Sequence, residues 1–246
     1  MELQRFKLIV QYDGSNFSGW QLQNNKRTIQ GVLEHTIKHI FRFKKRIPIH
    51  GSGRTDAGVH SSGQVAHVDV PLKISGDELQ KALNGNLPND CRIMDVSEVE
   101  ETFHARFNAK KRYYKYQCYL GDSILYRNQS WVLKNLEIDH LNHLAKIILG
   151  EHDFLSFCKF RKDIINTNCL IYASTWKSNE KMLTYFIEGN RFLHHMIRYL
   201  VGTMIAVIEG RYTEEEFTTL LFYPKKEVKI FKAPAAGLIL DKIDYA

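Results

Sequence analysis

One aspartate in this 246-residue sequence stands among residue types that often form functional loops. Asp56 lies in the stretch GSGRTDAGVH, residues 51–60, with Arg54 two positions before it and His60 four positions after it. A carboxylate in such a loop could act as a nucleophile, as a base, or as the partner of a cation. Glycine permits positive φ and close backbone contact at an entropic cost, so three glycines in ten residues indicate a loop whose shape matters.

Residue types alone also allow a plainer interpretation of this loop. Gly and Asp are common turn residues, and an exposed pair of Arg54 and Asp56 would contribute only about 0 to 1 kcal/mol. A nucleotide-binding loop does not fit, because Asp56 stands where the third glycine of a dinucleotide fingerprint would follow Gly51 and Gly53. The phosphate-binding signature Gly-Lys-Ser or Gly-Lys-Thr does not follow either.

The histidines give no recognisable metal motif. A catalytic zinc site often uses His-Glu-x-x-His, and none of the close pairs has this form. The pairs are His35 and His39, His140 and His143, and His194 and His195. The sequence also lacks a Gly-x-Ser-x-Gly elbow, although spacing alone leaves a Ser-His-Asp triad open. We therefore expect neither a metal nor a nucleotide cofactor.

Composition favours a folded protein with an anionic partner. The chain carries 34 Lys and Arg against 27 Asp and Glu, a formal net charge of +7, and 44% of its residues are hydrophobic. Nucleic acid is the first candidate for the partner. The four cysteines form no Cys-x-x-Cys pair, and neither a signal peptide nor an apolar run of about 18 residues is present. We expect reduced thiols, no membrane span and a cytoplasmic location.

The first half of the chain predicts alternating strands and helices. Residues 6–12 alternate with a period of two, as a strand does, and apolar residues in 29–43 follow the helical period. Ser75 and Glu78 have the spacing of a capping box for a helix to about residue 83. Further strands are predicted at residues 64–70, 91–99 and 112–120.

The second half predicts the same kinds of element. Asp139 is expected to cap a helix to Leu149, a strand at 183–188 leads into a helix at 192–209, and Thr213 opens another capping box. A last strand is predicted at 237–243. Interspersed strands and helices favour an α+β fold with antiparallel sheet. A break near residues 126–137 would divide the chain into an N-terminal subdomain, 1–130, and a C-terminal subdomain, 131–246.

Five separated motifs resemble the bacterial tRNA pseudouridine synthases of the TruA family. GRTDAGVH, residues 53–60, is the most specific of them. The others are YDGSNFSGWQ at 12–21, FHARF with RYYKY at 103–107 and 112–116, FLHHMIR at 192–198, and GLIL at 237–240. The resemblance spans nearly the whole chain.

This resemblance implies both a fold and a reaction. The fold would be two ferredoxin-like halves, of the kind seen in RNA-recognition motifs, whose antiparallel sheets join into one platform with an active-site cleft between them. The protein would be a homodimer that binds tRNA and needs no cofactor or metal. The reaction would isomerise uridine to pseudouridine at positions 38 to 40 of the anticodon stem-loop.

The resemblance also implies roles for five residues. Asp56 would be the catalytic carboxylate, attacking the sugar or the base or removing a sugar proton, and the sequence leaves these three routes open. Arg198 would pair with Asp56 and keep it ionised, where the alternative is an exposed residue on a helix. Arg54 would act as a wedge or a phosphate contact, Tyr114 would stack on the uracil, and Leu240 would be an apolar wall or part of the core.

Some features leave the RNA contacts open. The basic runs 44–46 and 110–112 could contact phosphates or could be ordinary solvated surface. The segment IINTNCLIYA, residues 164–173, lacks an arginine that relatives commonly carry before the strand with Trp176. A silent RNA-binding module would share the charge but would not need Asp56, and a hydrolase using the same carboxylate is a second alternative.

Overall fold

The structure is a computed structural model that describes residues 3–70, 74–134, 136–160 and 165–245. Contacts between residues divide the chain into two compact units. Unit 1 comprises Met1–Lys110 with Leu240–Ala246, and unit 2 comprises Lys111–Ile239. Each unit mixes helices with antiparallel strands, which confirms the predicted α+β class.

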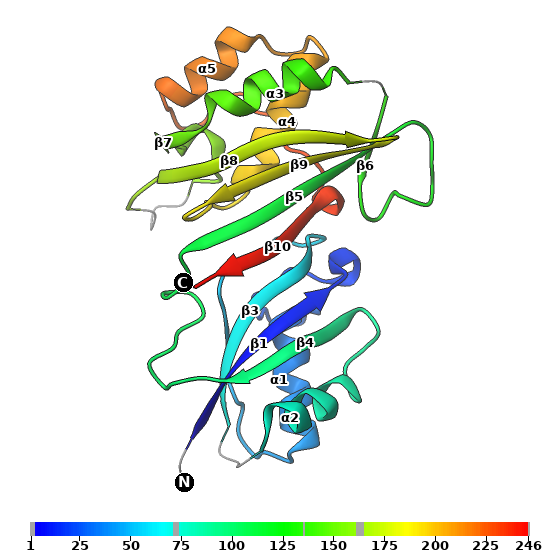
Figure 1. The fold of residues 1–246 in the computed structure, drawn as a ribbon, viewed down its shortest axis with the longest axis vertical. Coiled ribbons are helices and arrows are strands. Elements are labelled where there is room, and N and C mark those ends of the chain that lie inside the picture. The colour runs from blue at the N-terminus through cyan, green and yellow to red at the C-terminus, as the bar shows by residue number, and fades with distance from the viewer. Residues whose placement is uncertain (1–2, 71–73, 135, 161–164, 246) are drawn as a thin grey trace. The chain divides into compact units, whose positions relative to one another are not determined.

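Unit 1 has the order of elements that defines a ferredoxin-like half (Figure 1). Its elements are β1 (Gln4–Tyr12), the short 3-10 helix η1 (Gly14–Asn16), α1 (Ile29–Ile40), β2 (Ile49–Gly51), β3 (His60–Val70), α2 (Gly76–Asn84) and β4 (Cys91–Glu98). The strands pair antiparallel in the order β4-β1-β3-β2. This arrangement confirms the ferredoxin-like prediction for this unit.

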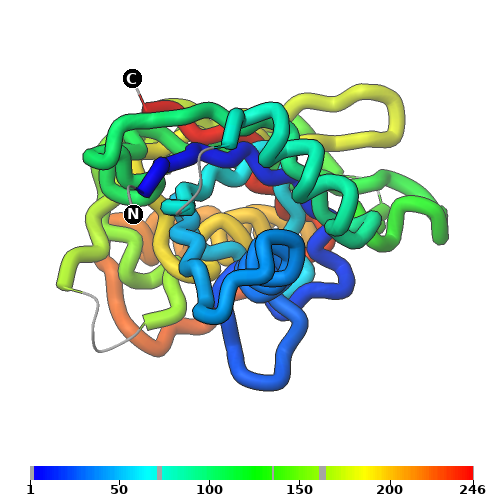
Figure 2. The backbone as a smooth tube through the Cα atoms, turned by 90° about the horizontal axis from the view of Figure 1, so that it is seen from below, coloured from blue at the N-terminus to red at the C-terminus, as the bar shows by residue number. Residues whose placement is uncertain are grey.

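The core of unit 1 lies between α1 and the sheet. Figures 1 and 2 show α1 against one face of β1, which places the apolar residues of both elements together. The buried side chains include, on β1, Phe6, Leu8 and Val10 and, on α1, Ile29, Leu33 and Ile37. The apolar residues that recur with a period of two on β1, and with the helical period on α1, therefore face the core.

Both predicted capping boxes are confirmed. Ser75 Oγ accepts the Glu78 N–H at 3.3 Å, and a Glu78 carboxylate oxygen accepts the Ser75 N–H at 2.9 Å. The same exchange joins Thr213 and Glu216 at 3.0 and 2.7 Å, at the start of α5 (Glu214–Phe222). Each box satisfies N–H groups that the first helical turn leaves without an intrahelical acceptor.

Unit 2 contains β5 (Lys111–Leu120), β6 (Trp131–Leu133), α3 (Ile138–Ile147), β7 (Gly150–Asp153), η2 (Leu155–Phe157), β8 (Asn168–Asn179), β9 (Met182–Gly189), α4 (Met196–Ile208) and η3 (Ala235–Gly237), together with α5. Its antiparallel strands pair in the order β5-β9-β8-β7, and β6 pairs parallel with β5. Asn142 on α3 fastens that helix to the sheet, because its amide exchanges hydrogen bonds with the backbone N–H and carbonyl of Trp176 at 2.8 and 3.1 Å. The last strand, β10 (Leu238–Asp244), is shared between the units.

Two helix starts in unit 2 differ from the sequence prediction. Asp139 does not cap α3, because Glu137 occupies the cap position without a side-chain bond and Asp139 lies inside the first turn. The helix expected from Phe192 begins at Met196 instead. His195 before it has a φ of 65°, the left-handed region, which a continuous right-handed helix cannot include.

Two expectations from the sequence concern the cysteine thiols and membrane-spanning helices. All four cysteines are free thiols, and three of them are buried. Within the described residues, no helix combines the length and the apolar character that crossing a bilayer requires.

Candidate active-site loop and its surroundings

Asp56 lies in a loop between β2 and β3 whose backbone is fixed by hydrogen bonds. At the start of the loop, the Ser52 N–H donates to the Val65 carbonyl at 2.8 Å. At its end, the Val59 N–H donates to the carbonyl of Asp56 itself at 3.2 Å, and Gly58 between them has a φ of 77°. Because only glycine adopts this φ without strain, Gly58 closes a tight turn directly after the half-buried Asp56.

The motif at residues 12–21 holds this loop from the other side. The Trp20 N–H donates to the Thr55 carbonyl at 3.1 Å, and the Gly58 N–H donates to the Phe17 carbonyl at 3.3 Å. Asp56 therefore sits between two backbone bonds to the same neighbouring segment. These two motifs, residues 12–21 and 53–60, thus form one structural unit, although 32 positions separate their nearest residues.

Gly19 allows this close approach. Its φ is 89°, and a Cβ atom built on it would lie 2.5 Å from the carbonyl oxygen of Thr55. Any side chain at this position would push the two segments apart. At Gly53, in the loop itself, an added Cβ would meet nothing within 4 Å among the described residues, so Gly19 and Gly53 serve different purposes.

His60 joins the start of β3 to the segment after β1. It is 5% exposed, and its Nδ1 accepts the Gly14 N–H at 3.1 Å. The same nitrogen lies 3.1 Å from Asp13 Oδ1. Partial burial raises the pKa of Asp13, but hydrogen bonds from the Ser15 hydroxyl and N–H outweigh it and hold that pKa below its ordinary value. Asp13 is therefore a structural carboxylate that organises this segment.

Arg54 is exposed, and its guanidinium is oriented by a side chain of the neighbouring motif. Its Nε donates to Gln21 Oε1 at 2.9 Å. The backbone beside it is held by Gln64, whose Nε2 donates to the Gly53 carbonyl at 2.8 Å. The sequence motif contained Gln21 but gave no reason to assign it a role.

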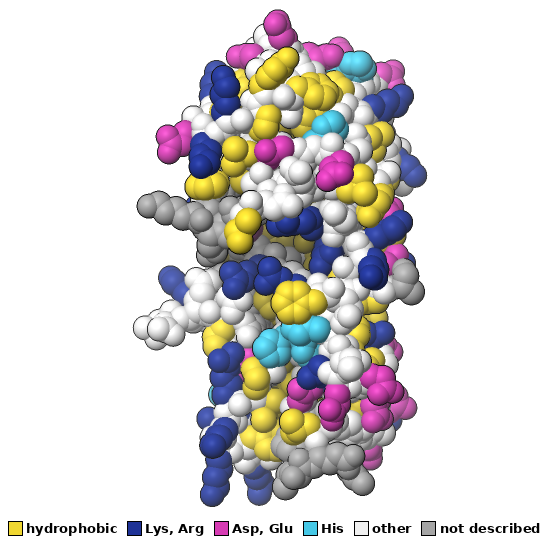
Figure 3. Space-filling view, turned by 90° about the vertical axis from the view of Figure 1, so that its left-hand side faces the viewer, with side chains coloured by type: hydrophobic (Ala, Val, Ile, Leu, Met, Phe, Trp, Pro, Cys, Tyr) yellow, Lys and Arg dark blue, Asp and Glu magenta, His cyan; other side chains and the backbone are white. Residues whose placement is uncertain are grey.

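The motif at residues 103–107 forms a turn built on histidines in unit 1. His104 Nδ1 accepts the N–H groups of Arg106 and Phe107 at 3.1 and 3.4 Å, and His67 Nδ1 accepts the Ala105 N–H at 3.1 Å. The Phe107 ring stacks on His104 at 4.3 Å between centroids but remains 76% exposed. Figure 3 shows histidine side chains gathered next to exposed hydrophobic ones on this face.

Burial sets the charge of this histidine group. His67 is 3% exposed, and burial together with the neighbouring His104 and His50 lowers its pKa to about 4. Burial also lowers the pKa of His104. The motif is therefore held by neutral imidazoles at neutral pH.

Tyr114 lies on β5 in unit 2 and is half-buried. Its ring meets that of Phe192 edge to face, with centroids 5.3 Å apart. Tyr116, two residues along the strand, is fully buried and donates its hydroxyl to the Pro234 carbonyl at 2.8 Å. Burial raises the pKa of Tyr116 well above its ordinary value, so this residue is a core tyrosine.

Arg198 lies in the first turn of α4 and is only 9% exposed. The alternative of an exposed arginine on a polar helix face is therefore wrong. Its Nε donates to the Ala233 carbonyl at 2.8 Å, and the Ala233 N–H donates to the Arg198 carbonyl at 2.9 Å. The backbone bond joins α4 to the segment before β10, and the Nε bond fixes the guanidinium relative to that segment. Arg198 was selected from the sequence by its motif, and nothing in the helical period indicated its burial.

Leu240 on β10 is 1% exposed, in agreement with the core-packing alternative. Its carbonyl accepts the hydroxyl of Ser61 at 3.0 Å, which attaches β10 to the start of β3. Asp56, Arg54 and Leu240 belong to unit 1, whereas Tyr114 and Arg198 belong to unit 2. A site that uses all five residues would need both units, and this remains a prediction.

Three residues of the two basic runs have partners among the described residues. Arg46 pairs with Glu34 at 2.5 Å, and Lys111 pairs with Glu188 at 2.7 Å. Arg112 donates to the Asn190 carbonyl at 2.5 Å. These contacts favour a structural role for those three side chains. The segment without arginine begins at residue 164, which lies outside the described residues, and continues into β8.

One known protein family matches most of this chain. The family model described as tRNA pseudouridine synthase matches residues 8–108 and 144–246. The chain belongs to the tRNA pseudouridine synthase family. The matched residues include Arg54, Asp56, Arg198 and Leu240, and Tyr114 lies between the two matched stretches.

Curated relatives in this family match over nearly their full length. The tRNA pseudouridine synthase A of Geobacillus kaustophilus is 37% identical, over 98% of this chain and 95% of its own. That of Dictyoglomus thermophilum is 40% identical, over 98% of this chain and 99% of its own. Among solved structures, a Cbf5-Nop10-Gar1 complex is similar at 13% identity and a TM-score of 0.36, covering 81% of this chain and 53% of that chain.

Proposed function

We propose that this protein isomerises uridine to pseudouridine at positions 38 to 40 of the tRNA anticodon stem-loop, with Asp56 as the catalytic carboxylate. Family membership supports the reaction and the class of substrate. The observation that carries the proposal is the loop itself, in which backbone bonds to the segment at residues 12–21 flank the half-buried Asp56 on both sides.

The chemistry requires little more than a positioned carboxylate. The bond from uracil N1 to ribose C1′ breaks, the base turns, and a bond from C5 to C1′ forms, after which C5 loses a proton and N1 gains one. No electrons or groups enter or leave, so the reaction calls for neither a metal nor a cofactor. Asp56 attacks C1′ or the base, or removes a sugar proton, and these three routes remain alternatives.

A carboxylate that acts as a nucleophile must remain ionised in a closed site, where burial alone raises its pKa. We assign Arg198 to pair with Asp56, because a guanidinium stays charged and binds a carboxylate through two hydrogen bonds. The burial of Arg198 and the Ala233 bond to its Nε support this role, since the bond fixes the plane of the guanidinium.

The target uridine is in a base-paired stem, so it must be extruded at a cost of a few kcal/mol. Stacking on Tyr114 would return part of that cost, about 1 to 3 kcal/mol. The edge-to-face contact with Phe192 supports this role by limiting the rotation of the Tyr114 ring. Arg54 would contact a phosphate or occupy the place that the base leaves. Leu240 would be an apolar wall of the pocket.

Three further expectations concern the oligomeric state, the cellular location and the subdomains of the protein. We expect a homodimer in the cytoplasm, where tRNA is modified. We also expect two working subdomains, 1–130 carrying the loop and 131–246 completing the cleft, whereas residue contacts divide the compact units after Lys110 and before Leu240. Size-exclusion chromatography with light scattering tests the oligomeric state.

Tritium release from tRNA transcript labelled at C5 of uridine tests the reaction, because the C5 proton leaves only when the new bond forms. Wild-type protein is expected to release tritium, and Asp56→Ala is expected to release none. Asp95→Asn is the matched control, since Asp95 is an exposed carboxylate on β4. Equal release by wild type and Asp56→Ala would end the proposal for Asp56.

The two alternatives give different products. A silent RNA-binding module would bind the transcript without releasing tritium. A hydrolase would leave abasic RNA and free uracil, which mass spectrometry detects as a loss of mass, whereas pseudouridine has the mass of uridine.

A further inference from the structure

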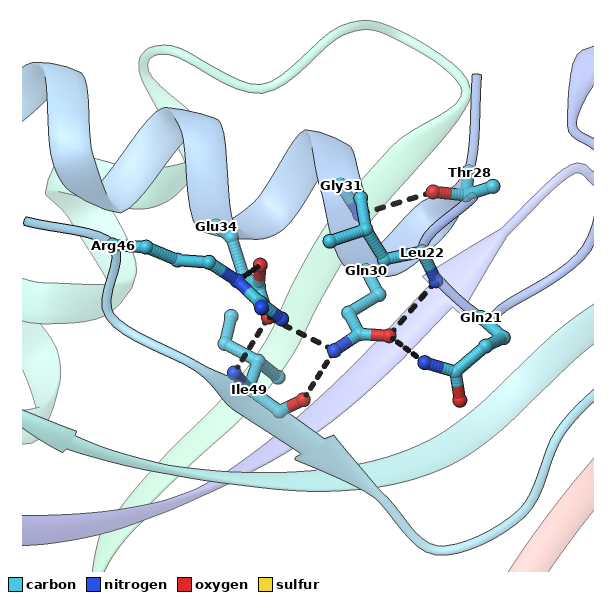
Figure 4. A network of polar contacts seen from close by, with 8 residues as sticks. All are labelled: Gln21, Leu22, Thr28, Gln30, Gly31, Glu34, Arg46 and Ile49. Atoms are coloured by element: carbon cyan, nitrogen blue, oxygen red, sulfur yellow. Dashed lines mark hydrogen bonds and ion pairs between the residues drawn. The ribbon is translucent and has the colours of Figure 1, made fainter. Parts of the chain in front are cut away.

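A continuous chain of polar side chains runs through unit 1 to Arg54. It begins at the ion pair of Arg46 and Glu34, passes through Gln30 on α1, and reaches Gln21 (Figure 4). Gln21 then accepts from Arg54. Glu34 and Gln30 also bind the backbone of Ile49 and so attach α1 to β2. That attachment does not explain the link from Gln21 to Arg54.

The first link is a buried carboxylate that accepts four hydrogen bonds. Glu34 is 5% exposed. Its Oε1 accepts from Arg46 Nη2, Gln30 Nε2 and the Ile49 N–H, each at 2.9 Å, and its Oε2 accepts from Arg46 Nε at 2.5 Å. An ionised carboxylate only accepts hydrogen bonds, so the side of Gln30 that faces it must be the amide nitrogen.

The orientation of Gln30 follows from this. Its Nε2 also donates to the Ile49 carbonyl at 3.1 Å, so the nitrogen faces two acceptors. Its oxygen then lies on the opposite side and accepts from Gln21 Nε2 and the Leu22 N–H, both at 2.9 Å. A flipped amide would place like groups against one another at all of these contacts. Gln30 is 6% exposed, so water would not relieve the mismatch.

The same logic fixes Gln21. Because its nitrogen is directed at Gln30, its oxygen points the other way and accepts from Arg54 Nε at 2.9 Å. Among the contacts of the described residues, this is the bond that the guanidinium of Arg54 makes. The two terminal nitrogens of Arg54 therefore remain available for an anion, while the Nε bond restricts the plane of the group.

We propose that Gln21 is a positioning residue that orients Arg54 toward the RNA, and that the buried Gln30 and Glu34 set the direction in which Gln21 presents its oxygen. This inference rests on the proposed function, because it assigns Arg54 to the substrate. An exposed arginine samples many rotamers, and each one that is excluded before binding lowers the entropic cost of the contact. The amides of Gln30 and Gln21 thus orient the Arg54 guanidinium before the RNA binds.

A double-mutant cycle tests the inference by measuring kcat/KM for tRNA with wild type, Gln21→Met, Arg54→Met and the double variant. Met has the length of Gln but accepts no hydrogen bond of useful strength. Arg54→Met is expected to lower kcat/KM about tenfold, and Gln21→Met about fivefold. With Arg54 already replaced, the Gln21 change is expected to cost less than about twofold, because its effect passes through Arg54.

Gln23→Met is the matched control. Gln23 is an exposed residue of the same type two positions along, and it donates to the Ser18 carbonyl instead of joining the chain. It is expected to leave kcat/KM and the melting temperature unchanged. Should Gln21→Met melt at a lower temperature than Gln23→Met, Gln21→Asn enters the same cycle, since it keeps an amide but is one methylene too short to reach Arg54.

Two results would overturn the inference. An equal loss from the Gln21 change with and without Arg54 would indicate a structural role only, and no loss in the wild-type background would indicate no role. Both results require an active wild-type protein, so they are distinct from a failure of the proposed function, in which wild type itself releases no tritium.

Discussion

The hydroxyl of Tyr12 lies 2.9 Å from the hydroxyl of Thr55, and this contact joins the end of β1 to the residue directly before Asp56. Both side chains are buried, Tyr12 at 3% and Thr55 at 7% exposure. The Trp20 N–H also donates to the Thr55 carbonyl. The position of the Asp56 carboxylate thus depends on the contact between Thr55 and the end of β1.

Removing the Tyr12 hydroxyl is expected to loosen the loop without opening a cavity. Tyr12→Phe leaves the Thr55 hydroxyl without this partner, so the free energy of unfolding should fall by about 1 kcal/mol and kcat by about threefold. Urea denaturation and tritium release measure the two effects. Tyr223→Phe serves as the control, because Tyr223 is 71% exposed. Unchanged values for both variants would show that the contact does not hold the loop.

Gly19 and Gly53 are expected to respond differently to alanine. Gly19→Ala combines a φ of 89° with a Cβ 2.5 Å from a backbone oxygen, so it should lower the free energy of unfolding by about 2 kcal/mol or more. Gly53→Ala, in the loop that carries Asp56, meets open space and should change it by less than about 0.5 kcal/mol. Denaturant titration of both proteins checks this. Equal losses would mean that the close approach at Gly19 is not tight.

His67 should make the protein less stable in mild acid. Burial lowers its pKa from the ordinary value of 6.5 to about 4, so between these values the unfolded chain binds a proton that the folded protein does not. The free energy of unfolding should therefore fall as pH drops from 6.5 to 4, by up to about 3 kcal/mol from this residue.

Urea denaturation from pH 7.5 to 4.5 measures this slope. His67→Asn retains a side-chain acceptor for the Ala105 N–H and should flatten the slope, whereas the exposed His39→Asn should not. An identical slope in wild type and His67→Asn would contradict the assignment.

Lysine should not replace Arg198 even though it keeps the charge. An ammonium cannot donate to the Ala233 carbonyl and at the same time bind a carboxylate through two parallel bonds, so Arg198→Lys should lower kcat about tenfold or more. Arg191→Lys, at an exposed arginine of the same unit, should have no effect. A fully active Arg198→Lys protein would rule out the paired role for the guanidinium.

Local signals in the sequence were sufficient for much of the fold. The two capping boxes depend on residues three positions apart, and the alternation in residues 6–12 depends on one strand and its core face, so both were predicted correctly. Asp139 failed as a cap because an aspartate in the first turn and one at the cap position look alike in sequence. The three-residue strand β2 was not predicted, since it exists only through pairing with β3.

The motif predicted the candidate site residues, but it did not predict the side chains that hold them in place. Asp56 and Arg54 could be named because GRTDAGVH is specific, whereas Gln21 needed the structure, because its role depends on the amide of Gln30 and the carboxylate of Glu34 behind it. The burial of Arg198 was likewise invisible to the sequence, since it depends on the segment around Ala233.

The central claim is that Asp56 carries the isomerisation and is not merely a part of the RNA-binding surface. Nucleoside chromatography of digested tRNA after a single turnover, with Asp56→Asn in excess over tRNA, tests this most directly when tRNA binding is measured beside it. Asp56→Asn is expected to bind tRNA within about twofold of wild type, since phosphate contacts dominate affinity, and to form no pseudouridine. Pseudouridine formed at the wild-type rate would contradict the account.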